Sequence, residues 1–300
     1  MPSLAPPYPD VTAVIAAYGQ DLPAGALNGA EWMLADAVSA SRIRRMTVGT
    51  VPLGEYVKGQ IYRGVLTGFN QAFVIDGARR AELIAADPSS AEIIKPFVVG
   101  KDIARWRPTY KDRWLIFTRR GIRIDDYPAI KQHLQQWRTD LTPKRPGVGR
   151  DKRGRKPGSY KWYEIQDDVA YYRSFGEPKI IFPDIALVPR FALDIMGAFL
   201  TNTAYFIVTG DPYLLGVLNS DAAFQIYATM SAQIRGGYLR FFRQYVEKFP
   251  VPAATTADRA RLTELVQKCL DAEGQGPDVV AWEAEINARV ARLYGLDTGE

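Results

Sequence analysis

The residues of this chain whose types could do chemistry gather between Leu141 and Trp162. Eight basic side chains lie there, opposed only by Asp151: Lys144, Arg145, Arg150, Lys152, Arg153, Arg155, Lys156 and Lys161. Guanidinium groups form bidentate hydrogen bonds with phosphate or guanine, and clustered like charges repel one another unless a polyanion relieves them. The stretch therefore predicts a segment that contacts nucleic-acid phosphates, with a solvated loop that has no partner as the alternative.

The backbone around these cations has the composition of a long, mobile loop. Three prolines and four glycines interrupt it, and no apolar residues recur at helical or strand spacing. Aromatic residues flank it at Tyr160, Trp162, Tyr163, Tyr171 and Tyr172. Such rings can stack on bases, but aromatic residues at strand spacing more commonly pack in a core. None of them is assigned as a stacking residue.

A second polar loop is expected within residues 64–76. Thr67, Gly68 and Asn70 tolerate turns and can hydrogen-bond backbone groups, and the apolar run 72–75 that follows predicts a buried strand. Thr67 and Asn70 would then lie at the end of that strand. Loops at strand ends commonly carry binding groups, so both are candidates for contact with a ligand.

The remaining pattern predicts an α+β fold: a mixed, mostly antiparallel twisted sheet with flanking helices and a C-terminal helical hairpin. Strands are expected at 113–118, 179–187, 191–194 and 204–208, and helices at 11–18, 78–86 and 238–248. The hairpin comprises the amphipathic stretches 256–272 and 277–294, each ended by a glycine. We expect an N-terminal helical and linker segment (1–50), a main domain (51–252) and the hairpin (253–300).

Composition sets independent bounds. The chain has 300 residues, 47% of them hydrophobic, and a net charge of +5. This is enough apolar material for a substantial core, and no apolar run approaches the length of a membrane span, so we expect a cytoplasmic protein without membrane contact. One cysteine, Cys269, excludes an internal disulfide, and with the single histidine, His133, it cannot form a zinc site. Both are interpreted as structural.

Several short motifs, taken in order, carry a resemblance to a known family. They are the turn and strand of 67–76 (Thr-Gly-x-Asn-x-Ala-Phe-x-Ile-Asp), Ile-Ile-Lys-Pro-Phe at 93–97, Gly-Lys-Asp-Ile-Ala-Arg-Trp at 100–106, Trp-Leu-Ile at 114–116, Tyr-Pro at 127–128, Trp-Tyr-Glu at 162–164, Pro-Lys-Ile-Ile at 178–181, Leu-Leu-Gly-Val-Leu-Asn-Ser at 214–220 and Phe-Pro-Val-Pro at 249–252. The set resembles the TaqI-like C-terminal specificity domain over roughly residues 50–252. That domain is the target recognition part of adenine-specific DNA methyltransferases and of single-chain type IIG restriction-modification enzymes.

The resemblance implies a module that recognises a double-stranded DNA sequence without being an enzyme by itself. The chain has neither a glycine-rich loop after a strand for S-adenosylmethionine nor an amino-methylation loop with a strand before it, so that cofactor is expected only in a separate catalytic domain. Loop residues are the candidates for DNA contact. Besides the basic loop they are Thr67, Asn70, Arg105, Arg107, Arg119, Arg120 and Arg190.

Two alternatives stay open. The chain could be a protein-interaction subunit that docks on a separate methyltransferase or endonuclease through its C-terminal hairpin. It could also be a Mg²⁺-dependent nuclease, because Asp167 or Asp168 lies about ten residues before Glu177-Pro178-Lys179, an arrangement that imitates two metal-binding carboxylates and a supporting lysine. Against this, Glu177 lies between Gly176 and Pro178, which predicts a turn and not the central strand such a site requires.

Overall fold

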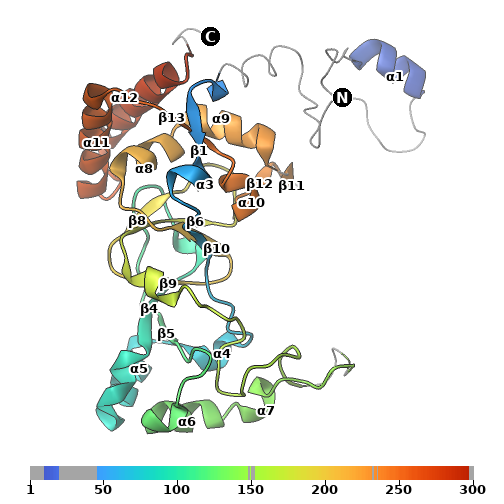
Figure 1. The fold of residues 1–300 in the computed structure, drawn as a ribbon, viewed down its shortest axis with the longest axis vertical. Coiled ribbons are helices and arrows are strands. Elements are labelled where there is room, and N and C mark those ends of the chain that lie inside the picture. The colour runs from blue at the N-terminus through green and yellow to red at the C-terminus, as the bar shows by residue number, and fades with distance from the viewer. Residues whose placement is uncertain are drawn as a thin grey trace.

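The computed structural model describes residues 10–19, 46–147, 149, 153–231, 233–234 and 236–296. Figure 1 shows an elongated molecule with two lobes joined by a central sheet. We call the lobe that contains the C-terminal helices the hairpin lobe, and the lobe at the other end the arm lobe, because the basic segment 142–163, hereafter the arm, belongs to it. The described residues form two separate apolar clusters, one for each lobe.

The central sheet supplies residues to both cores. Its strands β2 (Ile61–Arg63), β10 (Ala204–Ile207), β6 (Lys179–Pro183) and β8 (Ala192–Asp194) pair antiparallel in that order. Ile180 and Phe182 face the hairpin-lobe core, and Ile181 between them faces the arm-lobe core. Side chains of a strand alternate between its faces, so a strand buried on both faces is apolar throughout.

The arm lobe is built around a second four-stranded sheet. Strands β3 (Val74–Ile75), β5 (Trp114–Ile116) and β4 (Ile94–Val98) pair antiparallel, and β9 (Phe199–Leu200) adds to β4 in parallel. Around it lie α4 (Asn70–Phe73), α5 (Gly77–Ala86), α6 (Pro128–Gln135), α7 (Arg138–Leu141) and the short 3-10 turns η1 (Pro88–Glu92), η2 (Gly100–Asp102), η3 (Ile124–Asp126) and η4 (Tyr172–Gly176).

The strand predicted at 72–75 is only half correct. Ala72 and Phe73 end the helical turn α4, and extended backbone begins at Val74. Both side chains are buried in the arm-lobe core. A short apolar run does not by itself distinguish a buried helical turn from a buried strand.

The hairpin lobe consists mainly of helices. They are α3 (Leu53–Tyr56), α8 (Pro212–Leu218), α9 (Asp221–Met230), α10 (Arg243–Val246), α11 (Thr256–Asp271) and α12 (Pro277–Leu293), together with the antiparallel strand pair β1 (Thr50–Pro52) and β13 (Pro250–Pro252). A three-stranded sheet of β11 (Gln233–Ile234), β12 (Tyr238–Arg240) and β7 (Ile185–Ala186) flanks them. Helix α1 (Val11–Tyr18) precedes all of these.

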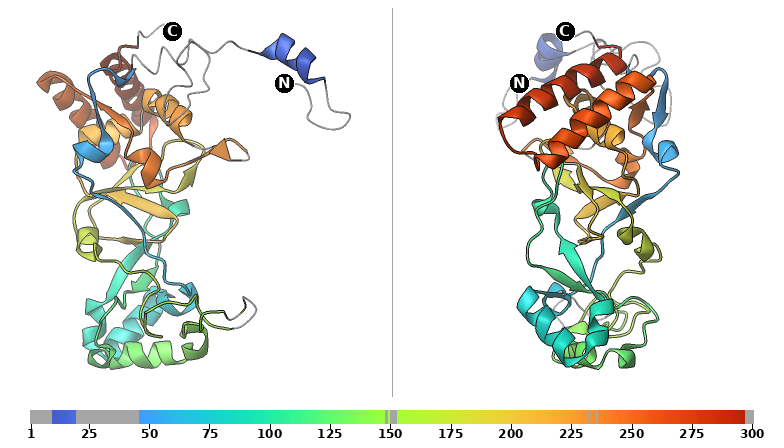
Figure 2. Two further views of the ribbon diagram at one scale, coloured as in Figure 1. Left: turned by 45° about the vertical axis from the view of Figure 1, so that its right-hand side comes forward. Right: turned by 90° about the vertical axis from the view of Figure 1, so that its left-hand side faces the viewer.

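The predicted hairpin is present, whereas the helix expected at 238–248 is divided into β12 and α10. Figure 2 shows α11 and α12 lying side by side across the end of the lobe. Their apolar residues, among them Leu265, Val266 and Ile286, are buried in the hairpin-lobe core. Gly216 of α8 permits this packing, since a Cβ atom there would lie 2.8 Å from a methyl carbon of Val266.

The structure confirms the α+β class with mostly antiparallel sheets, although the described strands form four sheets and not one. The domain boundaries stay a prediction. Cys269 and His133 are both buried, and the His133 ring lies 3.0 Å from the Ala72 carbonyl. In the described part of the chain, no helix has the length and apolarity that a membrane crossing requires.

Candidate nucleic-acid interface

Arg155 is a structural residue at the base of the arm. The residue is 3% exposed, and its guanidinium donates to the carbonyls of Leu141 at 2.7 Å, Thr67 at 2.8 Å and Trp162 at 3.0 Å. Burial lowers the pKa of Arg155 to about 10, so the group remains a cation at neutral pH. The expectation that Arg155 contacts phosphate is therefore corrected: its donors are already satisfied inside the protein.

Backbone contacts at the same point bring the two ends of the arm together. Lys144 N–H donates to the Arg155 carbonyl at 3.0 Å, and Arg155 N–H donates to the Thr142 carbonyl at 3.2 Å. Gly154 has φ +112, and a Cβ atom there would lie 2.7 Å from the Thr142 carbonyl oxygen. Glycine is required because of this close approach and this backbone conformation. The arm is thus a closed loop on a fixed base, which its composition does not indicate.

Thr67 belongs to this base and is fully buried. Its hydroxyl donates to Asn70 Oδ1 at 2.6 Å and accepts from Phe69 N–H at 3.1 Å, while its carbonyl accepts from Arg155. The expectation of DNA contact by the Thr67 side chain is corrected on the same ground as that of Arg155. Asn70 is exposed, so it stays a candidate.

The other arm cations are solvent-facing to different degrees. Arg153 is 71% exposed on its side chain and forms a two-point ion pair with Asp140, at 2.8 and 2.6 Å. Arg145 and Lys156 are exposed, and their side chains form no hydrogen bond or ion pair with the described residues. Lys144 is half-buried and donates to the Gly149 carbonyl at 3.2 Å. Arg150 and Lys152 lie outside the described residues.

Cations stacked near aromatic rings connect the arm to the end of β5. In this basic–aromatic band, the guanidinium of Arg119 lies 5.4 Å from the ring centroid of Tyr172, and that of Arg120 lies 5.2 Å from Tyr160. Two further pairs complete the band: Arg138 over Trp162 at 5.3 Å, and Lys161 over Tyr163 at 5.6 Å. A ring face orients a guanidinium without consuming its hydrogen-bond donors.

Arg120 is fixed further by donating to Ser159 Oγ at 3.1 Å and to the Gln166 carbonyl at 2.8 Å. Arg119 is exposed and lines a groove of about 360 Å³ on the arm lobe. This arm groove also contains Lys95, Tyr172, Arg173 and Gly197. Lys95 and Arg173 were not among the predicted contacts, because each is an isolated cation with no charged neighbour in the sequence.

A second basic groove, about 560 Å³, lies where α12 meets the segment after η2. This waist groove contains four cations and two carboxylates: Lys101, Arg105, Lys111, Arg190, Asp102 and Glu283. Arg105 pairs with Glu283 at 3.2 Å and Lys111 with Asp102 at 3.1 Å. The predicted Arg105 and Arg190 thus share one site, while Arg107 pairs with Glu273 at 3.3 Å and is not in the lining.

The nuclease-like pattern is used for structure. Lys179 is fully buried and donates to Asp194 at 2.5 Å and to the Phe175 carbonyl at 2.6 Å. Asp167 accepts from Leu66 N–H at 3.2 Å, and Glu177 is exposed in the turn before β6. Within the described ranges, no three His, Cys, Asp or Glu side chains are placed to hold a metal ion. The predicted nuclease arrangement is therefore absent from the described residues.

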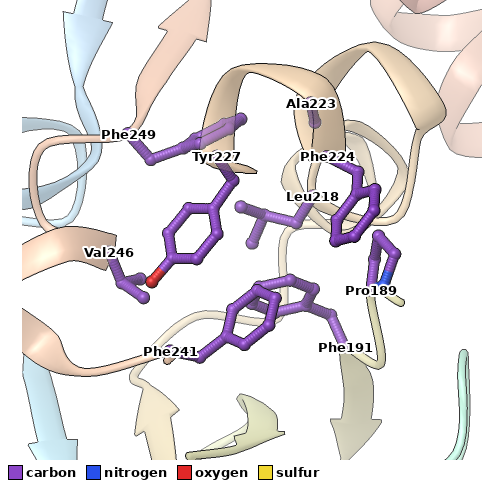
Figure 3. A pocket seen from close by; sticks show the side chains of 9 residues that line it. All are labelled: Pro189, Phe191, Leu218, Ala223, Phe224, Tyr227, Phe241, Val246 and Phe249. Carbon is purple, nitrogen blue, oxygen red and sulfur yellow. The ribbon is translucent and has the colours of Figure 1, made fainter. Parts of the chain in front are cut away.

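A small apolar cavity beneath α9 offers no polar chemistry. Figure 3 shows its lining side chains, among them Leu218, Phe241 and Tyr227. The Tyr227 hydroxyl donates to the Arg240 carbonyl at 2.7 Å. With a volume of about 10 Å³ the cavity holds at most a single water, so it is a packing defect of the core.

Comparison with known proteins gives a consistent set of similarities. The family model of the TaqI-like C-terminal specificity domain matches residues 95–251, slightly more than half of the chain. The type II methyltransferase M.PaeR7I of Pseudomonas aeruginosa is 27% identical over 91% of this chain, and M.XhoI of Xanthomonas vasicola is 24% identical over 92%. These alignments cover 44% and 47% of the two relatives, so the chain spans less than half of their length.

Among solved structures, the type IIL restriction-modification enzyme MmeI in complex with DNA has a similar fold. The superposition has a TM-score of 0.56 with 14% sequence identity, over 80% of this chain and 33% of that one. The aligned part is a fraction of a larger enzyme, as it is for both methyltransferases.

Proposed function

Because this chain belongs to the TaqI-like C-terminal specificity domain family, we propose that it recognises a specific double-stranded DNA sequence for an adenine-specific methyltransferase of a restriction-modification system. Its similarity to two type II methyltransferases supports that setting. The observation that carries the proposal is the basic–aromatic band, in which exposed cations are oriented by aromatic rings beside a groove. Oriented guanidinium groups suit base edges and phosphates.

Sequence-independent phosphate contact and oriented contact with bases or backbone are assigned to different regions of the molecule. Arg145, Lys156 and the other exposed arm cations attract phosphates without regard to sequence, because a charge on an open loop interacts with any nearby polyanion. Arg119 and Arg120 in the band and Arg105 in the waist groove are held by neighbouring groups, and Arg190 lines the waist groove. These four are the candidates for base contact or fixed backbone contact.

We further propose that the methyl transfer itself occurs in a separate catalytic domain or subunit. The relatives are methyltransferases more than twice as long as the aligned region. Isothermal titration of this chain with S-adenosylmethionine should give no heat of binding. Saturable binding with 1:1 stoichiometry would contradict the assignment of the cofactor to another domain.

Selection from a randomised duplex pool tests recognition directly. The purified chain is expected to enrich one motif and, in fluorescence anisotropy, to bind it ~10³-fold or more above mixed-sequence DNA. Titration at two salt concentrations separates the contribution of phosphate contacts from that of base contacts, since phosphate contacts weaken as the salt concentration rises. Enrichment of no motif, with salt-sensitive binding, would assign specificity to the separate catalytic domain or subunit. Absence of binding at low salt would contradict the proposal.

A further inference from the structure

At the end of β8 lie three large apolar side chains that are exposed, and we call them together the apolar ridge. Ile195 is 67% exposed, Met196 65% and Tyr110 44%. Ile195 and Met196 lie in the turn after β8, and the Tyr110 hydroxyl reaches the last residue of that strand, Asp194, at 2.6 Å. Large apolar side chains in contiguous exposed positions are unfavourable in water unless a partner covers them.

The backbone of this apolar ridge is held by one buried carboxylate. Asp194 Oδ1 accepts from Tyr110 and from Met196 N–H at 2.9 Å, and Oδ2 accepts from Ala198 N–H at 3.0 Å. The buried Lys179 pairs with the same carboxylate at 2.5 Å. Burial and the Asp194 charge raise the pKa of Tyr110, so its hydroxyl stays protonated and donates. The turn is therefore rigid while its side chains point into solvent.

Both basic grooves adjoin the ridge. Thr109 and Lys111, the chain neighbours of Tyr110, line the waist groove, and Gly197, the neighbour of Met196, lines the arm groove. The cations of the two linings are Lys101, Arg105, Lys111 and Arg190 on one side, and Lys95, Arg119 and Arg173 on the other. An apolar projection between two positively charged grooves matches a ligand whose apolar surface lies between two negatively charged edges.

Duplex DNA has that arrangement, since base pairs lie between two phosphate strands. We propose that the ridge of Tyr110, Ile195 and Met196 contacts the base stack, with Ile195 and Met196 acting as a wedge that partly unstacks one base step. This inference rests on the proposed DNA-binding function and adds to it a site and a mode of contact. Apolar wedges between base steps gain energy when the flanking protein surface binds the phosphates on either side.

Rigidity makes the wedge effective. A side chain on a turn already fixed by Asp194 loses little conformational entropy on insertion, so more of the contact energy appears as affinity. The deformation energy depends on the base step that is opened, with pyrimidine–purine steps opening most easily. The ridge therefore adds a preference for deformable steps to the hydrogen-bonded recognition by the arginines.

The test compares wild type with the double variant Ile195→Ser/Met196→Ser. The matched control is Val48→Ser, in the segment before β1, which removes a side chain of a residue that is 79% exposed and is in neither groove lining. The probe is a duplex that carries the motif enriched by wild type, with 2-aminopurine placed at successive positions. Wild type and control should raise the fluorescence severalfold at one step. The double variant should leave it at the level of free duplex and bind the motif roughly tenfold more weakly than wild type does.

The salt dependence of binding should be the same in all three proteins, because no cation is changed. Equal 2-aminopurine signals for wild type and double variant, or tight binding by wild type without any rise, would overturn the wedge and leave DNA recognition intact. Failure of wild type to bind any duplex at low salt would contradict both the wedge and the proposed DNA recognition. Concentration-dependent dimers in sedimentation that disappear only in the double variant would overturn the wedge and assign the ridge to contact between two copies.

Discussion

The arm and the waist groove both concentrate positive charge, but they hold it differently. In the arm the exposed cations Arg145 and Lys156 have no side-chain partner within the described structure, while the buried Arg155 fixes the base of the segment. In the waist groove Arg105 and Lys111 are paired with carboxylates from other elements. Unpaired cations such as those of the arm attract a polyanion over a distance, whereas paired cations such as those of the waist groove can fix the orientation of a bound ligand.

The two regions differ because a cation loses hydration and rotamer freedom when it is held in one position. An exposed cation on a loop keeps its hydration and its rotamer freedom, so its contribution is electrostatic and is screened by salt. Arg105, which is half-buried beside Glu283, has lost part of its hydration and of its rotamer freedom and presents its remaining donors in one direction. Under the proposed function, the arm would therefore hold DNA loosely and the waist groove would orient it.

The largest expected effect is a loss of stability on removing Arg155 at the base of the arm, in contrast to removing Arg145, an exposed cation of the same segment. Arg155→Ala should lower the free energy of unfolding by roughly 3 kcal/mol or more, because several buried carbonyls lose their donor at once. Arg145→Ala is the matched control and should leave stability unchanged. Urea unfolding of both variants provides the measurement. If Arg155→Ala lost DNA affinity with full stability, Arg155 would be a phosphate contact after all.

The next effect concerns the carboxylate that orders the waist groove. Glu283 of α12 accepts from Arg105 at 3.2 Å and from the buried Trp106 indole at 2.7 Å, and Trp106 has φ +75. Glu283→Ala should destabilise the protein by about 2 kcal/mol through these charge-assisted bonds. It should also increase affinity for mixed-sequence DNA and reduce discrimination of the enriched motif, because Arg105 is freed.

Glu283→Gln is the control for the charge, since it retains an acceptor for the indole. We expect it to recover most of the stability and to keep the increased affinity for mixed-sequence DNA. Thermal unfolding and anisotropy on the two DNA types measure both quantities. If Glu283→Ala discriminated the motif as well as wild type does, the pairing in the waist groove would have no role in orientation.

Paired variants of the two regions give a direct contrast. Arg145→Ala/Lys156→Ala should weaken binding equally for all sequences and reduce the slope of log affinity against log salt by about 2, near 0.9 for each phosphate that is no longer neutralised. Arg105→Ala/Arg190→Ala should reduce the slope less, because Arg105 is already paired with Glu283, but should penalise the enriched motif more than mixed DNA. Equal losses on both DNA types in the second variant would remove the distinction between the regions.

The smallest effect is expected for Arg153→Ala. Its guanidinium is already paired with Asp140 on the surface, and this ion pair holds the pKa of the Asp140 carboxyl below its usual range. Its removal should leave the unfolding transition in place and change the salt slope less than Arg145→Ala does, because a paired cation contributes less net field. A larger slope change for Arg153 would mean that DNA displaces Asp140.

Local sequence rules predicted where most helices begin and end, but they did not predict which segments pack against one another. Asp10, Asp76 and Asp87 accept backbone donors at the starts of the short helices that follow them, and the hairpin of α11 and α12 ends its first helix beside Gly274. These signals act within a few residues. The apolar run at 72–75 and the stretch 238–248 were misassigned because tertiary burial, and not local preference, decides short segments.

By itself, the sequence determined that positive charge would concentrate in the arm, that a helical hairpin would follow residue 252, and that an ordered set of motifs would identify the family. Only the tertiary structure decided which cations face solvent. Arg153 and Arg155 are two residues apart, yet one is 71% and the other 3% exposed. The reason is that the partners lie far apart in the sequence. Arg155 donates to Thr67, which is 88 residues away, and Arg105 donates to Glu283, which is 178 residues away. No local pattern records such pairings.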